Sequence, residues 1–370
     1  MNILVTGGAG FIGSFLVDEL IKQRHKVTVY DNLDPQVHIG SKKPYYLNKK
    51  AEFIKGDVCD YNKLKKIVLD KEIIFHFAEK VGVGQSQYEI KRYVDVNIGG
   101  TSNLLDIISN NQTKLKKLIV AGSMSSYGEG MYKCVKCGLI KPDLRTEEQM
   151  SKNLWELYCP KCSRKISPVP TSESATQNCN SIYAITKKVQ EEMTMIIGKA
   201  YKIPVVVLRF FNVYGPRQSL SNPYTGVCAI FMSRIKNNNS PVIFEDGLQT
   251  RDFIYVTDIV KACILVMNSE KANYEIFNVG TGIPVTILEI SKILAKLYGK
   301  KILPEVTNRF RKGDVRHCYA DISKIKKVVG FRPEIRFNEG MKLLVDWAKS
   351  VDAIDMYDKA ENELKKRNLV

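Results

Sequence analysis

Hydrophobic residues along the first third of the chain form short unbroken runs that alternate with helically spaced positions. Residues 2–6 and 27–30 are apolar runs of strand length, and residues 11–22 between them carry apolar side chains at helical spacing. The alternation continues with strand-like segments at 51–58, 73–78 and 116–123 and a helix near 95–110. This pattern predicts an α/β fold built on a mostly parallel, doubly wound sheet, with ligands at the carboxyl ends of the strands.

A glycine-rich turn, residues 7–13, joins the first strand to the first helix. Gly7 would make the tight turn, Gly10 would let the backbone approach a pyrophosphate, and Gly13 would allow close helix packing. The helix N-terminus would attract the anion. Asp31, 18 residues after Gly13, would bind a ribose hydroxyl and repel a 2′-phosphate. The turn therefore predicts a Rossmann-type domain that binds NAD rather than NADP.

Tyr183 and Lys187 stand four residues apart in a segment of helical spacing, so their side chains share one helix face. A nearby ammonium and the positive nicotinamide would stabilise a phenolate, whose ordinary pKa is about 10. Tyr183 could then remove a hydroxyl proton while hydride leaves to NAD. Ser123, at the end of its strand, could bond the same oxygen and relay the proton. We predict these three residues to be catalytic, and we interpret His76, inside an apolar strand, as a core residue.

These motifs resemble the extended short-chain dehydrogenase/reductase superfamily, and within it the NAD-dependent nucleotide-sugar epimerases and dehydratases. The resemblance rests on GGAGFIG, Asp31, Asp57-Val58, HFA, SMSSYG, YAITK and RFFNVYGPRQ. SNPYTGVCAIF, FEDGLQTRDFIYV and FRKGDVRHCYADISK are similar to nucleotide-sugar 4-epimerases, most closely to dTDP-L-rhamnose 4-epimerases. Such a reaction takes hydride from sugar C4, forms a 4-keto sugar and returns the hydride to the opposite face. The resemblance implies that NAD is tightly bound and regenerated in each turnover.

The resemblance also implies two sets of binding residues. NAD would be held by Gly7, Gly10, Phe11, Ile12, Gly13, Asp31, Asn32, Asp57, Val58, Phe77, Ala78, Asn97, Tyr183, Lys187 and Phe210. The nucleotide sugar would be faced by Ser125, Asn212, Thr225, Val227, Phe244, Arg251, Arg311 and Asp314. Arg251 and Arg311 are planar donors that could bind a pyrophosphate bidentately, and Phe244 offers a flat face to a pyrimidine.

Other reactions stay open at this point. Family 4,6-dehydratases and decarboxylases carry an acid shortly after the catalytic Ser or Thr, whereas Met124 follows Ser123 here. This favours a 4-epimerase, although Glu129 lies nearby and keeps the dehydratase as an alternative. A 4-epimerase of UDP-glucose or UDP-glucuronate is another alternative, and a non-catalytic NAD- and zinc-binding protein is a third. Glu79 replaces the small residue usual after HFA, and we expect it to touch neither the proton path nor the hydride path.

Two cysteine pairs, Cys134-x2-Cys137 and Cys159-x2-Cys162, are separated by 21 residues. Paired CxxC turns at such spacing predict a zinc ribbon, because each turn presents two thiolates to one tetrahedral ion. A redox dithiol would need only one pair. With all four positions filled by thiols, the zinc would be structural rather than catalytic. Since the insertion separates Ser123 from Tyr183, we hypothesise that it forms a wall or lid of the active site.

The expected domains are discontinuous. Residues 1–133, 163–210 and 249–285 would form the NAD-binding domain, with the ribbon at 134–162. Residues 211–248 and 286–350 would form a smaller α/β lobe for the nucleotide sugar. Residues 351–370 are rich in Lys and Glu, and we expect a solvated helix or a frayed end there. The superfamily resemblance further implies a homodimer formed through the helix of Tyr183 and its neighbour.

Composition narrows the class of protein. The chain has 370 residues, of which 44% are hydrophobic and 26% charged, as in a globular protein. Its net charge of +17 is spread over lysines along the whole chain, without an arginine-rich arm, and this favours an anionic small ligand over nucleic acid. No apolar run approaches the roughly 20 residues of a membrane helix. We find no charged leader ahead of an apolar stretch, so we expect a cytoplasmic protein without membrane partners.

Overall fold

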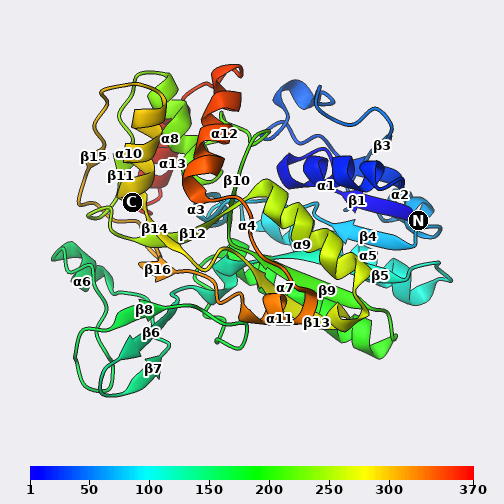
Figure 1. Ribbon diagram of the computed structural model, residues 1–370, viewed down its shortest axis with the longest axis horizontal. Coiled ribbons are helices and arrows are strands. Elements are labelled where there is room, and N and C mark those ends of the chain that lie inside the picture. Colours follow the sequence, from blue (N-terminus) through cyan, green and yellow to red (C-terminus); the bar gives the residue numbers. More distant parts are fainter.

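The computed structural model describes residues 1–39 and 41–370, and its largest layer is a seven-stranded sheet (Figure 1). The strands follow the order β13-β9-β5-β4-β1-β2-β3, and every neighbouring pair is parallel. Their bounds are β1 (Asn2–Thr6), β2 (Lys26–Asp31), β3 (Glu52–Lys55), β4 (Ile73–His76), β5 (Lys117–Ser123), β9 (Val205–Phe210) and β13 (Glu275–Val279). The prediction of a Rossmann-type α/β fold is confirmed.

Helices cover both faces of this sheet because the strands are apolar on both faces. Ile3 and Val5 of β1 pack in one core with Leu16, whereas Leu4 between them packs in another with Leu104. The first face carries α1 (Phe11–Lys22), α9 (Val256–Asn268) and α11 (Ser323–Val329); the second carries α2 (Tyr61–Val68), α5 (Gly100–Asn110) and α7 (Ile182–Ala200). Short helical segments precede α5: α3 (Val83–Ser86), α4 (Ile90–Tyr93) and the π-helical η2 (Val94–Gly99).

A smaller lobe has its own four-stranded sheet and its own apolar core. Its strands are β10 (Asn212–Tyr214), β12 (Thr250–Tyr255), β14 (Pro284–Thr286) and β16 (His317–Cys318). Its helices are α8 (Val227–Lys236), α10 (Ile287–Leu297) and α12 (Phe337–Lys349), beside the strand pair β11 (Val242–Ile243) and β15 (Glu305–Val306). Residues 250–255, which we expected in the main domain, form β12 here, because β13 occupies the place beside β9 in the main sheet. The helix α9 that follows packs on α1.

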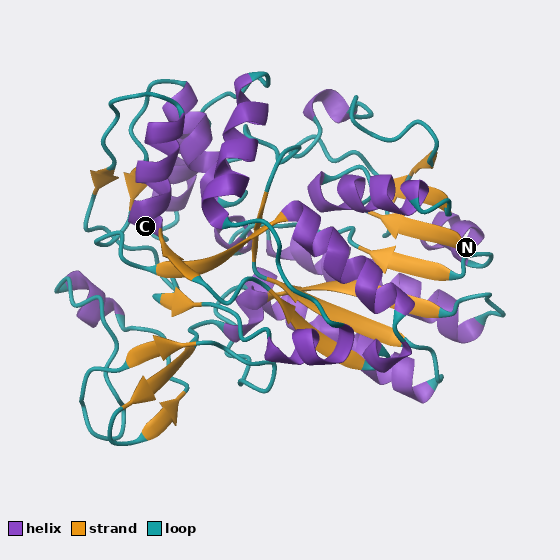
Figure 2. Cartoon of the chain, in the orientation of Figure 1, coloured by secondary structure: helices purple, strands orange, loops and turns teal.

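The segment with the two cysteine pairs forms a third layer. It contains β6 (Met131–Cys134), β7 (Gly138–Ile140), α6 (Glu147–Ser151) and β8 (Ser167–Val169). The strands form an antiparallel sheet in the order β7-β6-β8, which stands apart from the two larger sheets in Figure 2. Tyr132, Ile140, Leu157 and Ile166 are buried in its small core beside the cysteines.

The C-terminal segment is neither frayed nor fully solvated. It forms α13 (Tyr357–Lys365), whose Glu361 carboxylate lies 2.8 Å from the Arg309 guanidinium of the smaller lobe. Beyond α13, the Arg367 guanidinium lies 4.2 Å from the ring centroid of Tyr88 in the main domain. Tyr357, Ala360 and Leu364 recur at helical spacing, so the tail has one apolar face to pack.

Among the described residues, no helix has the length and apolar character needed to cross a bilayer.

Candidate active site

A cleft of about 650 Å³ lies between the main sheet and the smaller lobe. On the main-domain side its wall includes Gly7, Asp31 and Ser123, which follow or end β1, β2 and β5. Strand order reverses at β1, since β2 and β4 lie on its two sides. The carboxyl ends of strands at such a reversal form the crevice where doubly wound sheets bind ligands.

The glycine turn at one end of the cleft has no room for a side chain at Gly7 or Gly13. Gly7 has φ of 68°, and a Cβ there would lie 2.7 Å from the backbone of Phe77. A Cβ on Gly13 would lie 2.4 Å from the Gly7 carbonyl oxygen. At the end of β2, the Asp31 carboxylate accepts hydrogen bonds from the backbone N–H groups of Ala9 (3.1 Å) and Leu33 (2.9 Å). A backbone cradle beside a carboxylate has the shape and donor set that a dinucleotide requires.

Thirteen of the fifteen residues expected to hold NAD line this cleft. They are Gly7, Gly10, Phe11, Ile12, Gly13, Asp31, Asn32, Asp57, Val58, Phe77, Ala78, Tyr183 and Phe210. Asn97 and Lys187 lie behind the wall instead. The buried Asn97 amide accepts a hydrogen bond from the Lys80 N–H (2.7 Å) and donates one to Thr186 Oγ1 (3.0 Å). Asn97 thus fastens the loop after β4 to α7.

Tyr183 lies in the first turn of α7, where Ser181 caps the helix by accepting the Ala184 N–H at 3.1 Å. The Tyr183 ring is buried and packs edge-on against Tyr93, with 6.4 Å between centroids. Burial raises the pKa of Tyr183 well above 10 and the Glu79 carboxylate raises it further, whereas a hydrogen bond from Ser123 lowers it. The phenol therefore needs positive charge nearby before it can act as a base.

Ser123 and Ser125 extend a line of hydroxyl groups from Tyr183 into the cleft. Ser123 Oγ accepts hydrogen bonds from the Ser125 N–H (3.2 Å) and the Ser125 hydroxyl (2.9 Å), within the turn η3 (Met124–Tyr127) that follows β5. Since these bonds occupy acceptor positions on Ser123, its own proton can point to Tyr183. The arrangement suits a proton relay.

Lys187 follows Tyr183 by one helical turn and is almost completely buried. Its ammonium donates to the Ala121 carbonyl oxygen at 2.5 Å and forms an ion pair with Glu79. Our expectation that Glu79 touches neither reaction path was therefore wrong. β4 pairs with β5, so the residues just beyond β4 lie beside the end of β5, where Lys187 is anchored.

The other end of the cleft carries the residues predicted to face the nucleotide sugar. Ser125, Asn212, Thr225, Val227, Phe244, Arg251, Arg311 and Asp314 all line the cleft. Asp314 accepts from Arg251 (3.2 Å) and Arg311 (3.1 Å), and the Arg311 guanidinium lies 4.8 Å from the ring centroid of Phe244. Burial acts to raise the pKa of Asp314, but Arg311 and Arg251 hold it below its usual value. Two guanidinium groups beside an aromatic face suit a pyrophosphate joined to a base.

Sequence reasoning missed the part of the wall that the C-terminal segment supplies. Tyr357, Ala360, Glu361, Leu364 and Leu369 all line the cleft. The signal that could have found them is the helical spacing of the three apolar residues from Tyr357 to Leu364, which a purely solvated helix would lack.

Glu129, the acid that kept a dehydratase open, does not line the cleft. It is buried, and its carboxylate accepts from the Tyr132 hydroxyl (2.7 Å) and from the N–H groups of Arg316 (2.8 Å) and His317 (2.7 Å). These bonds fix the carboxylate behind the smaller lobe, so Glu129 is not placed for acid–base work on a ligand.

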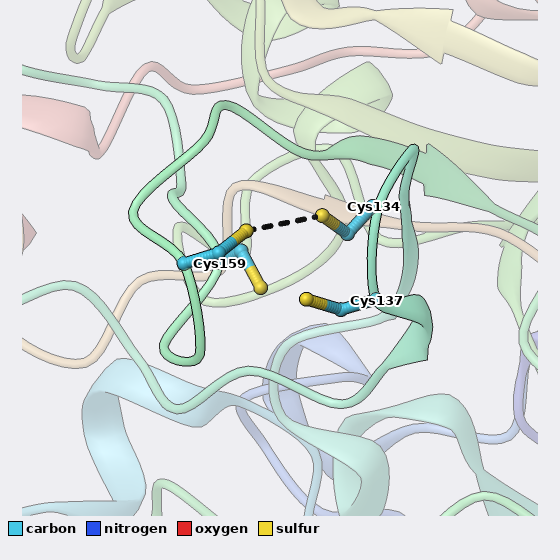
Figure 3. A group of neighbouring side chains, drawn as sticks. Cys134, Cys137 and Cys159 are labelled. Carbon is cyan, nitrogen blue, oxygen red and sulfur yellow. Dashed lines mark hydrogen bonds between the residues drawn. The ribbon is translucent and has the colours of Figure 1, made fainter.

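The four cysteines converge at the end of β6 and in the turn at residues 159–162. Figure 3 shows the sulfur atoms of Cys134, Cys137 and Cys159 turned toward one another. All four Sγ atoms lie within 4.8 Å of one another, and the backbone N–H groups of Cys137 and Lys136 lower the pKa of the Cys134 thiol to about 6. Thiolates about 2.3 Å from a tetrahedral zinc ion would have comparable spacing. The donor set therefore fits zinc.

Comparisons with known proteins agree with this geometry. Residues 3–280 match the model of the NAD dependent epimerase/dehydratase family. The chain is 34% identical over 352 residues to a dTDP-L-rhamnose 4-epimerase of Burkholderia thailandensis, covering 94% of each chain. It resembles the structure of a Thermotoga maritima UDP-glucose 4-epimerase with UDP-glucose (32% identity, TM-score 0.77, 94% of this chain and 99% of the other).

A second similar structure is a Bacillus cereus UDP-glucuronic acid 4-epimerase in complex with UDP-glucuronic acid and NAD (27% identity, TM-score 0.76, 94% of this chain and 99% of the other). The family match and the relative from Burkholderia thailandensis each extend over most of the chain. The chain therefore belongs to the NAD-dependent epimerase/dehydratase family.

Proposed function

We propose that the enzyme is an NAD-dependent 4-epimerase that interconverts dTDP-L-rhamnose and dTDP-6-deoxy-L-talose. The observation that carries the proposal is the position of Tyr183 and Ser123 in one cleft, between a glycine cradle and an arginine pair. A sugar joined to a pyrophosphate at Arg251 and Arg311 reaches back toward the phenol, while a dinucleotide on the cradle reaches the same place from the other side.

Side chains of this enzyme accept, relay and return the proton of the reaction. The glycine turn and Asp31 would hold NAD, which would supply the hydride acceptor and donor. Tyr183 takes the proton of the C4 hydroxyl, and Ser123 holds the same oxygen and links Tyr183 to Ser125. The Lys187 ammonium, one turn away, stabilises the phenolate. The 4-keto sugar would then rotate in the cleft and present its opposite face. Tyr183 would return the proton to the C4 oxygen, which becomes the new hydroxyl.

Two observations favour epimerisation over 4,6-dehydration. Met124 stands where dehydratases carry an acid, and the Glu129 carboxylate is engaged by backbone N–H groups away from the cleft. The choice of dTDP-L-rhamnose rests on the relative that is 34% identical over 94% of the chain. Because UDP-sugar 4-epimerases share nearly the same identity, UDP-glucose and UDP-glucuronate are the alternative substrates.

NMR of the purified enzyme tests the proposal. The enzyme is incubated separately with dTDP-L-rhamnose, UDP-glucose and UDP-glucuronic acid, first without and then with added NAD, and inversion at C4 is followed. Conversion of dTDP-L-rhamnose to the 6-deoxytalose epimer is expected. Inversion of a UDP sugar alone would keep the mechanism and replace the substrate. No conversion even with NAD would favour a dehydratase or a non-catalytic NAD- and zinc-binding protein.

We also propose a structural zinc ion on Cys134, Cys137, Cys159 and Cys162. Four thiolates leave no open position for water or substrate, so the ion would hold the insertion together without taking part in the reaction. Elemental analysis should find one zinc per chain in the wild-type protein. A variant with Cys134→Ser and Cys137→Ser should lose it, whereas Cys228→Ser, in the core of the smaller lobe, should keep it.

We further propose that the enzyme is a cytoplasmic homodimer joined through α5 and α7. Ile185 and Ile196 are three helical turns apart on α7, and 45% and 64% of their surfaces are exposed. A second α7 would cover these apolar side chains. Light scattering should give the mass of two chains, and Ile196→Asp should reduce it to one. Cell fractionation should recover the enzyme in the cytoplasm.

A further inference from the structure

The insertion at residues 134–162, called here the ribbon insertion, contacts the segments that form the nucleotide-sugar end of the cleft, on their side away from the cleft. We propose that it is a positioning element for that end, acting through the buried side chain of Arg145. The inference rests on the proposed function, because it assigns a role to residues that would bind the nucleotide sugar. It also replaces our hypothesis of a wall or lid, since among the described residues none of 134–162 lines the cleft.

The central contact is an ion pair between the ribbon insertion and the smaller lobe. The Arg145 guanidinium donates to both carboxylate oxygens of Glu245, at 2.7 and 2.8 Å, and both side chains have no exposed surface. Glu245 directly follows Phe244, and its backbone N–H donates to the Arg309 carbonyl oxygen at 2.7 Å. The Arg145 guanidinium also donates to the backbone carbonyl oxygen of Asp314 at 3.2 Å. Arg145 thus joins the segments on both sides of the predicted nucleotide site.

A second buried arginine extends the contact. Arg316 has a completely buried side chain, and it donates to Glu156 of the ribbon insertion (2.6 Å), Asp246 (2.6 and 2.9 Å) and Glu245 (3.0 Å). The pair Arg145 and Arg316 therefore shares the Glu245 carboxylate. Buried charges of this kind are stable only while each keeps its partners. The fold of the ribbon insertion and the position of the Glu245 segment consequently depend on each other.

The network ends at side chains that line the cleft. Arg251 donates to the Asp314 carboxylate (3.2 Å) and to the backbone carbonyl oxygens of Val315 (2.5 Å) and Arg316 (3.1 Å). Asp314 is in turn held by Arg145 through its own carbonyl oxygen. Arg251 and Asp314 are therefore each one hydrogen bond away from a buried arginine, and Phe244 directly precedes Glu245, which both arginines bind. Loss of Arg145 would let all three shift, although Arg145 itself does not line the cleft.

Arg145→Met tests the proposal, with Arg164→Met, just beyond the end of the insertion, as the control. Arg164 is exposed, so its replacement removes a similar charge without the buried contact. Calorimetry measures binding of dTDP, UDP and NAD to each protein, and steady-state kinetics gives KM and kcat. For Arg145→Met we expect the nucleotide diphosphate Kd and the sugar KM to rise about tenfold or more. NAD binding should be unchanged and kcat should stay within about twofold.

If Arg145→Met binds nucleotide diphosphate with the same Kd as the wild type, the proposal is overturned. It is also overturned if the affinities for NAD and for nucleotide diphosphate fall by the same factor. If Arg145→Met does not fold, Glu156→Gln replaces it, because it removes a negative charge that pairs with Arg316 at a half-buried position. Arg145→Lys, which keeps the charge, should restore part of the affinity. If the wild-type enzyme itself binds neither dTDP nor UDP, the proposed function fails rather than the role of Arg145.

Discussion

The Glu79 carboxylate and the Lys187 ammonium form an ion pair, and the negative charge of Glu79 raises the pKa of Tyr183. Glu79 follows the end of β4, and Lys187 follows Tyr183 by one turn of α7. The lysine stabilises a phenolate in our mechanism, but the carboxylate cancels part of its charge. In this mechanism the two residues have opposite effects on the pKa of Tyr183, and the effect of Glu79 can be measured directly.

Replacing Glu79 by Gln should lower the pKa of Tyr183, because it removes a negative charge that raises that pKa. Since the phenolate is the active form in our mechanism, the acidic limb of the kcat/KM profile should move to lower pH. A pH series of epimerisation rates measures the shift. Glu72→Gln, at a partly exposed ion pair with Lys116 beyond the other end of β4, is the control and should not move the limb. If the acidic limb of Glu79→Gln moved to higher pH instead, Glu79 would not raise the pKa of Tyr183.

Tyr183→Phe removes the proton acceptor while it keeps the buried ring against Tyr93. Turnover should fall by about 10²–10⁴, whereas binding of NAD and nucleotide diphosphate should stay close to that of the wild type. Single-turnover kinetics with calorimetry separates the two effects. Tyr201→Phe, at the exposed end of the same helix, should behave as the wild type. Unchanged turnover in Tyr183→Phe would remove the tyrosine from the mechanism.

Gly13→Ala should disturb the cradle for the dinucleotide, because the new methyl group would lie 2.4 Å from the Gly7 carbonyl oxygen. We expect a loss of about 1–3 kcal/mol of unfolding free energy together with weaker NAD binding. Gly99→Ala is the control, since its methyl group would meet no neighbour closer than 3.9 Å. Denaturant titration and NAD calorimetry measure both effects. Equal values for the two variants would show that the turn has room for a side chain.

Removal of residues 356–370 should open the cleft on the side covered by α13. The sugar KM should rise about tenfold, because the apolar side chains that this segment contributes to the cleft wall are removed. The fold should persist, since the truncated chain keeps Asp355 and its ion pair with Arg234. Kinetics and thermal unfolding of the shortened chain test this. An unchanged KM at unchanged stability would mean that the tail contributes nothing to binding.

The elements of the main sheet could be predicted closely from the sequence. The apolar runs gave β1 and α1 at their observed bounds, and Ser123 indeed ends β5. His76 proved to be a core residue, hydrogen-bonded at 2.9 Å to Thr6 and at 3.0 Å to Thr101, and burial lowers its pKa to about 3. These features follow from local periodicity, which repeats within a few residues.

Contacts between distant segments could not be predicted in this way. Arg145 and Glu245 are 100 positions apart, and neither position is distinguished by its neighbours in the sequence. Glu79 looked incidental because the pattern after HFA does not reveal that the residue faces Lys187. The charges of the tail suggested solvent exposure, although its apolar face packs over the cleft. In each case the partner is chosen by tertiary packing rather than by local spacing.

The tail also bears on how the protein can be handled. The Leu369 side chain lines the cleft and its carbonyl oxygen accepts the Lys312 N–H at 3.3 Å, so the penultimate residue belongs to the binding wall. In Figure 1 the N-terminus lies at the opposite side of the molecule from the C-terminus. An affinity tag or fusion partner attached before Met1 therefore lies far from the part of the binding wall that Leu369 supplies.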